Sequence, residues 1–138
     1  MQAGVTGKRI AVVGAGIAGA SLAAELAGKS RVLLLEGEDR PGYHATGRSA
    51  AFWTESYGGE KVLPLTAASG PLLRSLGMLR PRGALTLGRA GQEAAVEAFV
   101  NTYAAAGVRA SVEDRSEIER RVPGLLPAWV IGAWEPDC

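Results

Sequence analysis

Apolar residues in the first third of the chain fall into short runs that are separated by glycine-rich turns. Residues 8–13 start with two charges and continue as Ile-Ala-Val-Val, which predicts a strand. Residues 17–27 repeat alanine and leucine at four-residue spacing and stop before Gly28, which predicts a helix. Residues 31–36 contain four consecutive apolar residues, as in a parallel strand that is covered on both faces. Together the three segments predict a β-α-β unit with a right-handed crossover.

The pattern becomes less regular beyond residue 36. Residues 36–59 show no sustained period, and a loop of this length in a compact domain is usually functional. Residues 62–76 place their apolar side chains on one helical face, which predicts core packing, but Gly70 and Pro71 interrupt it, so we expect a kink or two short helices. The side chains on that face are those of Val62, Leu65, Ser69, Leu72, Leu73 and Leu76. The remaining expected elements are a helix over residues 92–106 that buries Val96, Phe99, Val100 and Tyr103, strands over residues 83–88, 108–112 and 129–134, and a short helix with a capping box of Ser116 and Glu119 that ends before Pro123.

Composition and charge narrow the class of protein. The 138 residues are 47% hydrophobic and carry a formal net charge of +1, which is typical of a folded chain and not of a disordered one. No positive cluster points to a nucleic acid as partner, and the single histidine excludes a multi-histidine site, so no metal is expected. The only cysteine, Cys138, excludes an internal disulfide and favours a reducing, cytoplasmic compartment.

The longest uncharged run, residues 10–24, is shorter than the ~20 residues of a membrane-spanning helix, so no membrane span is expected. A signal peptide is the alternative for this run, with Lys8 and Arg9 as its basic region. The glycines within the run are better explained by a phosphate site.

Residues 14–19 read Gly-Ala-Gly-Ile-Ala-Gly and match the G-x-G-x-x-G pattern between a predicted strand and a predicted helix. Gly14 permits the tight turn, Gly16 lets the backbone approach a diphosphate, and Gly19 lets helix and strand pack closely. The helix N-terminus then offers N–H groups and the positive end of its dipole to the diphosphate. Glu36 follows the first glycine by about 20 residues, where an acid binds the adenosine ribose and repels the 2′-phosphate of NADP. The motif predicts an adenine dinucleotide but does not separate FAD from NAD.

The segment after the second predicted strand resembles a known family. Residues 36–42 (Glu-Gly-Glu-Asp-Arg-Pro-Gly) and 44–51 (His-Ala-Thr-Gly-Arg-Ser-Ala-Ala) are similar to the FAD-dependent D-amino acid oxidase family, in particular to its D-arginine dehydrogenase-like and deaminating glycine/D-amino acid oxidase members. The likeness continues through residues 57–58 and 65–69 and covers most of the chain from Arg9 onward. It implies FAD as the cofactor and an α/β fold in which a Rossmann-like FAD-binding β-α-β start is followed by part of an α+β substrate domain.

The glycine motif and the resemblance together imply a set of FAD contacts. The resemblance places residues 46–49 at the pyrophosphate and the ribityl chain, and the backbone of Ala50 and Ala51 near the isoalloxazine ring. Arg48 is a fixed cation that can bridge phosphate oxygens, and an ordinary surface arginine is the alternative. The full set is Gly14, Gly16, Ile17, Ala18, Gly19, Glu36, Gly37, Arg40, Thr46, Gly47, Arg48, Ser49, Ala50 and Ala51.

The resemblance also implies two substrate-facing side chains. Tyr57 lies where related dehydrogenases have a mobile lid tyrosine over the substrate, and a half-buried packing role is its alternative. Phe52 stands where the D-arginine dehydrogenase has a histidine, and residues 80–84 lack the acid that binds a guanidinium, so arginine is disfavoured as the substrate. His44 is expected to be a solvent-exposed loop residue rather than a cofactor contact. No catalytic base is assigned, and the acidic residues among 113–119 are expected to serve a helix N-terminus.

The implied reaction is oxidation of the carbon–nitrogen bond of a small-molecule amine or D-amino acid, with hydride transfer to the flavin. The alternative is an NAD-binding Rossmann module or a non-catalytic nucleotide-binding domain, but residues 46–51 favour the flavoenzyme. We place the start of the FAD-binding domain at residues 1–59 and the start of the substrate domain at residues 60–138. Since only two parallel strands precede residue 60, we expect an N-terminal fragment that is inactive alone and whose partner is the missing C-terminal sequence of the same enzyme.

Overall fold

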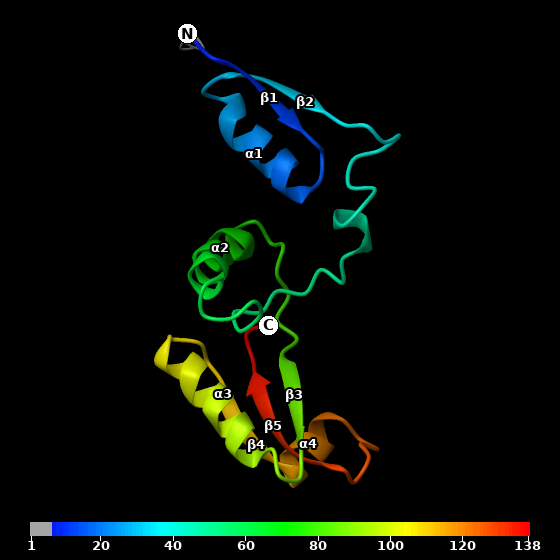
Figure 1. Ribbon diagram of the computed structural model, residues 1–138, viewed down its shortest axis with the longest axis vertical. Coiled ribbons are helices and arrows are strands. Elements are labelled where there is room, and N and C mark those ends of the chain that lie inside the picture. The colour runs from blue at the N-terminus through cyan, green and yellow to red at the C-terminus, as the bar shows by residue number, and fades with distance from the viewer. Residues whose placement is uncertain (1–6) are drawn as a thin grey trace. The chain divides into compact units, whose positions relative to one another are not determined.

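The computed structural model describes residues 7–138. Its elements in chain order are β1 (Arg9–Val13), α1 (Ile17–Ala27), β2 (Arg31–Leu35), the 3₁₀ turn η1 (Thr46–Arg48), α2 (Leu63–Ser75), β3 (Ala84–Arg89), α3 (Glu93–Ala105), β4 (Ser111–Asp114), α4 (Arg115–Arg121) and β5 (Trp129–Glu135) (Figure 1). The chain divides into two compact units, Met1–Ala51 and Phe52–Cys138, named here the N-terminal unit and the C-terminal unit. The division comes earlier than the expected boundary after residue 59, because Thr54 and Ser56 bond to Glu135.

The N-terminal unit is the predicted β-α-β unit. β1 and β2 pair in parallel, and α1 connects them and contacts both strands (Figure 1). Val12 is buried and its side chain lies close to Gly19 of α1, so this face of the sheet is the covered one. Neighbouring residues of a strand point to opposite faces, and Val13 and Leu33 on the other face are 84% and 58% exposed. Among the residues that the structure describes, only α1 covers this sheet, and its other face is exposed.

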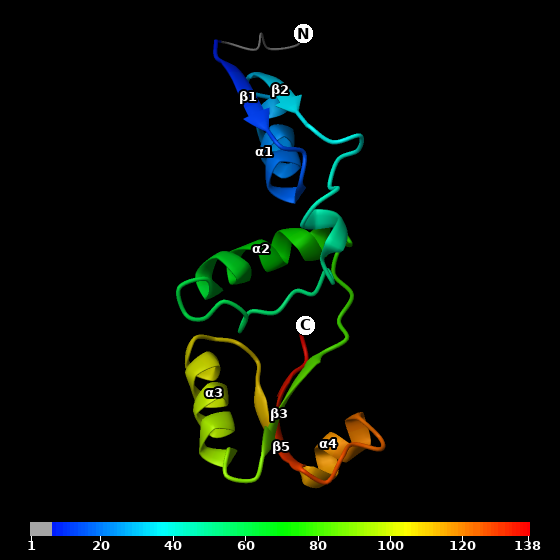
Figure 2. The ribbon, with the colours of Figure 1, turned by 45° about the vertical axis from the view of Figure 1, so that its right-hand side comes forward.

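The C-terminal unit is built on an antiparallel sheet in the order β3-β5-β4. Its central strand, β5, lies between α3 and α4, which cover opposite faces (Figure 2). On one face Ile131 and Ala133 pack against Val96 of α3. On the other face Gly132 lies under the fully buried Ile118 of α4, and a Cβ on this glycine would come within 2.9 Å of the Ile118 side chain. Alternation along one strand thus supplies the core on both sides of the sheet.

The third helix agrees with the sequence-based expectation, whereas the following strand begins later than predicted. Val96, Val100 and Tyr103 of α3 are buried and Phe99 is half-buried, as expected. The strand predicted at residues 108–112 begins at Ser111. The reason is that Val108 packs with Tyr103 in a second apolar cluster before the chain reaches the sheet.

Helix α2 is continuous from Leu63 to Ser75 with Pro71 inside it, so the expected division into two short helices is wrong. A Cβ on Gly70 would lie 2.9 Å from the Trp53 ring, and the Arg74 guanidinium lies over that ring at 5.0 Å from its centroid. Pro71 removes one backbone hydrogen bond. The contacts that Trp53 makes on both sides of the proline hold the helix across it. Gly70 therefore provides a flat surface for an indole ring and does not break the helix.

The apolar face expected for α2 is wrong for four of its six residues, since only Ser69 and Leu73 are half-buried. Leu63 is 8% exposed and packs with Tyr103 of α3, whereas Leu65, Leu72 and Leu76 are 74%, 56% and 56% exposed. The buried face is the one that carries Leu63 and Gly70, because the absence of a side chain at Gly70 lets the Trp53 ring approach the helix closely. Hydrophobic periodicity alone could not identify that face.

The N-cap of α4 is Asp114, so the expected capping box of Ser116 and Glu119 is wrong. The Asp114 carboxylate accepts the backbone N–H of Glu117 at 3.0 Å and the Ser116 hydroxyl at 2.6 Å. The Glu119 carboxylate pairs with Arg115 instead. A carboxylate at this position also complements the positive end of the helix dipole, as expected for Asp114. The expectation is wrong for Glu113, a buried residue of β4 whose carboxylate accepts hydrogen bonds from Ser111 and Arg121.

Arg115 closes the connection between α4 and β5. Its guanidinium donates hydrogen bonds to the backbone carbonyls of Leu125, Leu126 and Trp129 at 2.8, 3.0 and 2.7 Å. One side chain thereby bonds two carbonyls of the connecting loop, those of Leu125 and Leu126, and the carbonyl of Trp129, the first residue of β5. Over residues 7–138, no helix combines the length and the apolar character that a membrane crossing requires.

Replacing Arg115 with alanine would remove its guanidinium from these three carbonyls, of which that of Leu126 keeps another donor, the N–H of Trp129. We expect the free energy of unfolding to fall by about 2 kcal/mol, measured by urea denaturation. The matched control is Arg120→Ala, which removes only the surface ion pair with Glu117 and should change the free energy of unfolding by less than about 0.5 kcal/mol. Equal effects of the two substitutions would contradict the role given to Arg115.

Candidate functional site

The turn between β1 and α1 is closed by backbone contacts. Gly14 has a φ of +94°, and its N–H donates to the Leu35 carbonyl at the end of β2 at 2.7 Å. A Cβ on Gly19 would lie 1.9 Å from the Gly14 carbonyl oxygen, so only glycine permits α1 to start this close to the turn. Gly14 and Gly19 thus have the structural roles that the motif predicts.

The first turn of α1 is prepared for an anion. The helix begins at Ile17, and its N-cap is Gly16, which has no side chain to bond to the first N–H groups of the helix. The Thr46 hydroxyl accepts the Ile17 N–H at 2.9 Å, and a Cβ on Gly16 would lie 3.1 Å from that hydroxyl oxygen. The N–H groups of Ala18 and Gly19 belong to the same turn, at the positive end of the helix dipole, where phosphate oxygens bind.

The loop after β2 folds back over this turn. The Gly42 N–H donates to the Ala15 carbonyl at 3.1 Å, and the Gly47 N–H donates to the Gly42 carbonyl at 2.7 Å. A Cβ on Gly47 would lie 2.5 Å from that carbonyl oxygen, so this close approach also requires glycine. The turn and the loop form a hollow of 260 Å³, named here the glycine-turn hollow, that is lined by Gly14, Gly16, Glu36, Gly42, Tyr43, His44, Ala45 and Thr46.

Four predicted contacts meet at this hollow: Gly14, Gly16, Glu36 and Thr46. Sequence reasoning missed the lining residues Gly42, Tyr43 and Ala45. The Pro41-Gly42 pair is a turn signal that could have indicated where the loop reverses, and Gly42 has a φ of +71°. The side chain of His44 is 67% exposed and pairs with Glu38 at 2.6 Å, as expected of an exposed loop residue, but His44 also lines the hollow, where no cofactor contact was expected of it.

Glu36 is held by three backbone donors. One carboxylate oxygen accepts the Ala15 N–H at 2.8 Å, and the other accepts the N–H groups of Gly37 at 2.8 Å and Glu38 at 3.1 Å. These hydrogen bonds, that from Ala15 first, lower the pKa of Glu36 below its ordinary value. A carboxylate has about four acceptor positions, so roughly one remains for a ribose hydroxyl. The charge that would repel a 2′-phosphate is therefore stabilised before any ligand binds.

Arg40 and Arg48 flank Tyr43. The guanidinium carbon of each lies 5.5 Å from the centroid of the Tyr43 ring, within the range of a cation–π contact. Neither arginine lines the glycine-turn hollow, but both lie against a ring that does. The remaining predicted contacts within residues 7–51 lie outside its lining: Gly37, Gly47, Ser49, Ala50 and Ala51, together with Ile17, Ala18 and Gly19 of the helix.

The two predicted substrate-facing residues belong to the C-terminal unit. Phe52 is 44% exposed, and the Arg82 guanidinium lies 5.9 Å from its ring centroid. Tyr57 is 79% exposed, which does not fit a half-buried packing role. In the part of the chain that the structure describes, no group of three histidine, cysteine, aspartate or glutamate side chains is placed to hold a metal ion.

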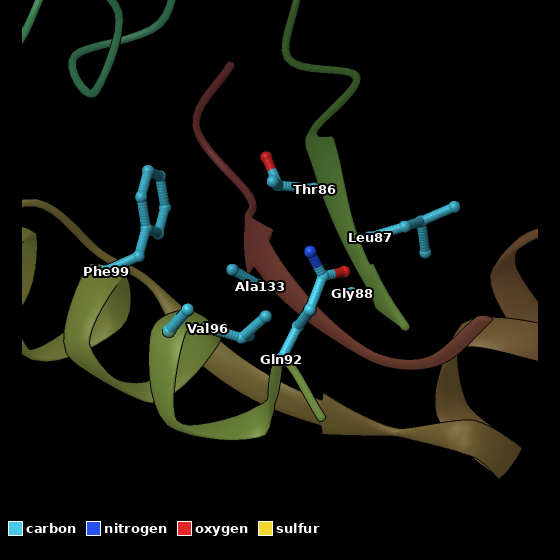
Figure 3. Close-up of a pocket in the computed structure, with 8 residues that line it drawn as sticks. Thr86, Leu87, Gly88, Gln92, Val96, Phe99 and Ala133 are labelled. Atoms are coloured by element: carbon cyan, nitrogen blue, oxygen red, sulfur yellow. The ribbon is translucent and has the colours of Figure 1, made fainter. Parts of the chain in front are cut away.

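A second hollow lies on the α3 face of the sheet, where Gln92 and Val96 reach toward Gly88 of β3 (Figure 3). It has a volume of 190 Å³. No charged side chain is among its lining residues, which are Thr86, Leu87, Gly88, Gln92, Ala95, Val96, Phe99 and Ala133. The glycine-turn hollow, with its carboxylate and helix N-terminus, is therefore the better candidate for a cofactor site.

The glycine-turn hollow has the chemistry that the ADP half of FAD requires. Bare glycine backbone allows close approach, and the first turn of α1 offers N–H groups to the diphosphate. Glu36 keeps an acceptor for the ribose, and Arg40 and Arg48 bring positive charge to the same loop. The donor set of this chain thus fits the cofactor that the sequence implies.

The substitution Gly19→Ala places a methyl group 1.9 Å from the Gly14 carbonyl oxygen. We expect α1 to be pushed from the turn and FAD affinity to fall by at least about tenfold, because the N–H groups no longer converge on the diphosphate. Gly28→Ala is the matched control, since a Cβ on Gly28 meets no atom within 4 Å. Isothermal titration with FAD measures both variants, and unchanged affinity in Gly19→Ala would contradict the assigned site.

The pH dependence of Glu36 follows from its backbone donors. Because the folded state lowers the pKa of Glu36, its stabilising contribution is full above the unfolded-state pKa of 4.5 and is lost as the pH falls through the lower folded-state pKa. We expect a ¹³C NMR titration of the Glu36 carboxyl carbon to have its midpoint below 4.5. A midpoint at or above that value would mean that the three N–H groups do not bind the carboxylate in solution.

The chain is similar to known proteins in sequence and in fold. The family model DAO, described as FAD dependent oxidoreductase, matches residues 9–138. The glycine oxidase from Geobacillus kaustophilus has a similar fold, with a TM-score of 0.79 and 23% sequence identity over 94% of this chain and 40% of that chain. The glycine oxidase from Bacillus cereus ATCC 14579 gives a TM-score of 0.78 and 15% identity over 92% of this chain and 38% of that chain.

This chain therefore spans about two fifths of the length of those two glycine oxidases. At these sequence identities the likeness to the solved structures concerns the fold alone. The family assignment rests on the family model, which matches nearly the whole chain. The protein belongs to the DAO family of FAD-dependent oxidoreductases, and its cofactor is FAD.

Proposed function

We propose that the enzyme to which this chain belongs oxidises the carbon–nitrogen bond of a small amine or D-amino acid. FAD-dependent oxidation is the reaction class of the family, and both similar solved structures are named glycine oxidases. The observation that carries the proposal is the glycine-turn hollow, where Glu36, Thr46 and the N-terminus of α1 meet. The choice of an amine is supported by the resemblance of residues 44–51 to enzymes that act on amino acids.

In the proposed complex the N-terminal unit holds the ADP half of FAD. The N–H groups of Ala18 and Gly19 would donate to the diphosphate, and Arg48 would neutralise part of its charge. Glu36 would accept one ribose hydroxyl with the acceptor position that its backbone donors leave free. Thr46 would act indirectly, since its hydroxyl already accepts the first N–H of α1 and so orients the turn.

When bound, FAD would accept a hydride from the carbon that bears the amine, and water would hydrolyse the resulting imine to a carbonyl compound and ammonia. Phe52 and Tyr57 would contact the substrate through their rings. Residues 80–84 include two arginines and no acid, so a guanidinium on the substrate would meet like charge. These features favour a substrate with an uncharged side chain. We assign no base, and the amine would therefore react in its neutral form.

We further propose that turnover requires more polypeptide than this chain. The face of the β1–β2 sheet opposite α1 exposes Val13, Leu33 and Leu35 at 84%, 58% and 45%. Parallel sheets are normally covered on both faces. The chain also spans only about two fifths of the glycine oxidases that it resembles in fold. We expect further sequence of the same enzyme to cover this face and to complete the substrate site.

The test uses the full-length enzyme, purified with its bound cofactor. We expect the visible absorption of oxidised flavin, and we expect it to bleach when glycine, D-alanine or benzylamine is added without oxygen, with release of ammonia. A matched sample that carries Gly19→Ala should hold little flavin and show no bleaching. Bleaching by 2-hydroxy acids alone, with no response to any amine, would contradict the proposed substrate class.

A further inference from the structure

Glu135, the last residue of β5, is a buried carboxylate that lies outside the FAD-binding unit. It is 3% exposed. The Ser56 hydroxyl donates to one carboxylate oxygen at 2.7 Å, and the Thr54 hydroxyl donates to the other at 3.2 Å. The two hydroxyl oxygens lie 3.1 Å apart. Residues 54–56 therefore bind both oxygens of the Glu135 carboxylate. Across residues 7–138, no ion pair includes Glu135.

This arrangement is a poor way to gain stability. Burial of a carboxyl group costs desolvation free energy when no cation pairs with it, and two neutral hydroxyls offset only part of that cost. An apolar side chain at the end of β5 would pack without the same penalty. The two hydrogen bonds instead fix the positions of Thr54 and Ser56, and thereby the conformation of the backbone that carries both.

The same stretch is held at its start by α2. The Trp53 ring lies against Gly70 and under the Arg74 guanidinium. Its indole N–H is buried, and no group among residues 7–138 accepts a hydrogen bond from it. Packing therefore holds the ring. Residues 53–56 are named here the anchored segment. They contact α2 through Trp53 and the end of β5 through Thr54 and Ser56.

Tyr57 is the first residue beyond the anchored segment. Its side chain is 79% exposed although it is a large aromatic ring. Gly58 and Gly59 follow with φ values of +87° and +75°, which glycine adopts without strain. The ring thus lies between a fixed segment and two permissive residues. The direction of the Tyr57 ring therefore depends on the anchored segment.

We propose that Glu135 is a positioning residue, whose carboxylate fixes the anchored segment so that the Tyr57 ring is presented to the substrate. The inference rests on the proposed function, in which Tyr57 contacts an amine or amino acid. Glu135 itself touches neither substrate nor cofactor. It acts through Ser56 and Thr54.

The kinetic test compares Glu135→Gln, Tyr57→Ala and the double variant in the FAD-loaded full-length enzyme, with glycine, D-alanine or benzylamine as substrate. We expect Glu135→Gln to raise KM about tenfold, the effect of roughly one lost hydrogen bond, while kcat changes less than about twofold. Tyr57→Ala should raise KM at least as much, and the double variant should match Tyr57→Ala. Glu97→Gln, at an exposed position of α3, is the control and should leave both constants unchanged.

A second readout does not depend on turnover. Chymotrypsin cleavage after Tyr57, located by mass spectrometry, should be about tenfold faster in Glu135→Gln, because cleavage follows the population of the released segment. Ser56→Ala should behave alike. Ser56→Thr retains the hydroxyl and should restore the slow rate.

Unchanged KM and unchanged cleavage in Glu135→Gln would overturn the proposal. So would an additive effect in the double variant, because Glu135 would then act independently of Tyr57. If Glu135→Gln loses flavin or cooperative unfolding, Ser56→Ala takes its place with the same expected values, and unchanged values there overturn the proposal. If no amine bleaches the wild-type flavin, the proposed function fails independently of the role of Glu135. If, in addition, chymotrypsin cleaves Glu135→Gln no faster than the wild type, the anchoring role of Glu135 is also contradicted.

Discussion

The approach of Gly19 to the carbonyl oxygen of Gly14 is the constraint on which the N-terminal unit depends. With a hydrogen atom in place of a Cβ, α1 starts beside the ends of β1 and β2. Only then does the Glu36 carboxylate reach the Ala15 N–H, and only then does the Thr46 hydroxyl reach the Ile17 N–H. Three segments that are distant in sequence converge on one helix N-terminus, which is what a diphosphate requires.

In the C-terminal unit, glycines also permit close approach, but the group that approaches them is an aromatic side chain and not a cofactor. A Cβ on Gly83 would lie 1.9 Å from the Trp134 ring, whose other neighbour is the Arg121 guanidinium at 3.9 Å from the centroid. Gly70 similarly accepts the ring of Trp53. The chain has 19 glycines among 138 residues, and these contacts explain part of that excess as packing rather than flexibility.

Two carboxylates show how the surroundings divide the roles of one functional group. Glu36 is exposed, and backbone N–H donors lower its pKa and leave capacity for a ligand. Glu135 is buried, and two hydroxyls occupy both of its oxygens. The first carboxylate is suited to binding because part of it still faces solvent. The second is suited to holding a segment in place because its partners belong to the same chain.

The sequence by itself determined the β-α-β unit and the residues Gly14, Gly19 and Glu36, because strand period, helix period and glycine spacing are local properties of the chain. Tertiary structure decided what depends on distant partners. Thr46 proved to bind the first N–H of α1 across 29 residues, and Glu135 meets Thr54 and Ser56 across 81 and 79 residues.

The buried face of α2 shows the same limit. Its leucines repeat at helical spacing, yet Trp53 and α3 select the face that carries Leu63 and Gly70. Tyr43 was missed at the glycine-turn hollow because its place there depends on how the loop closes over the turn. Periodicity records which residues share a face, whereas burial depends on what another part of the chain brings against that face, and only folding determines it.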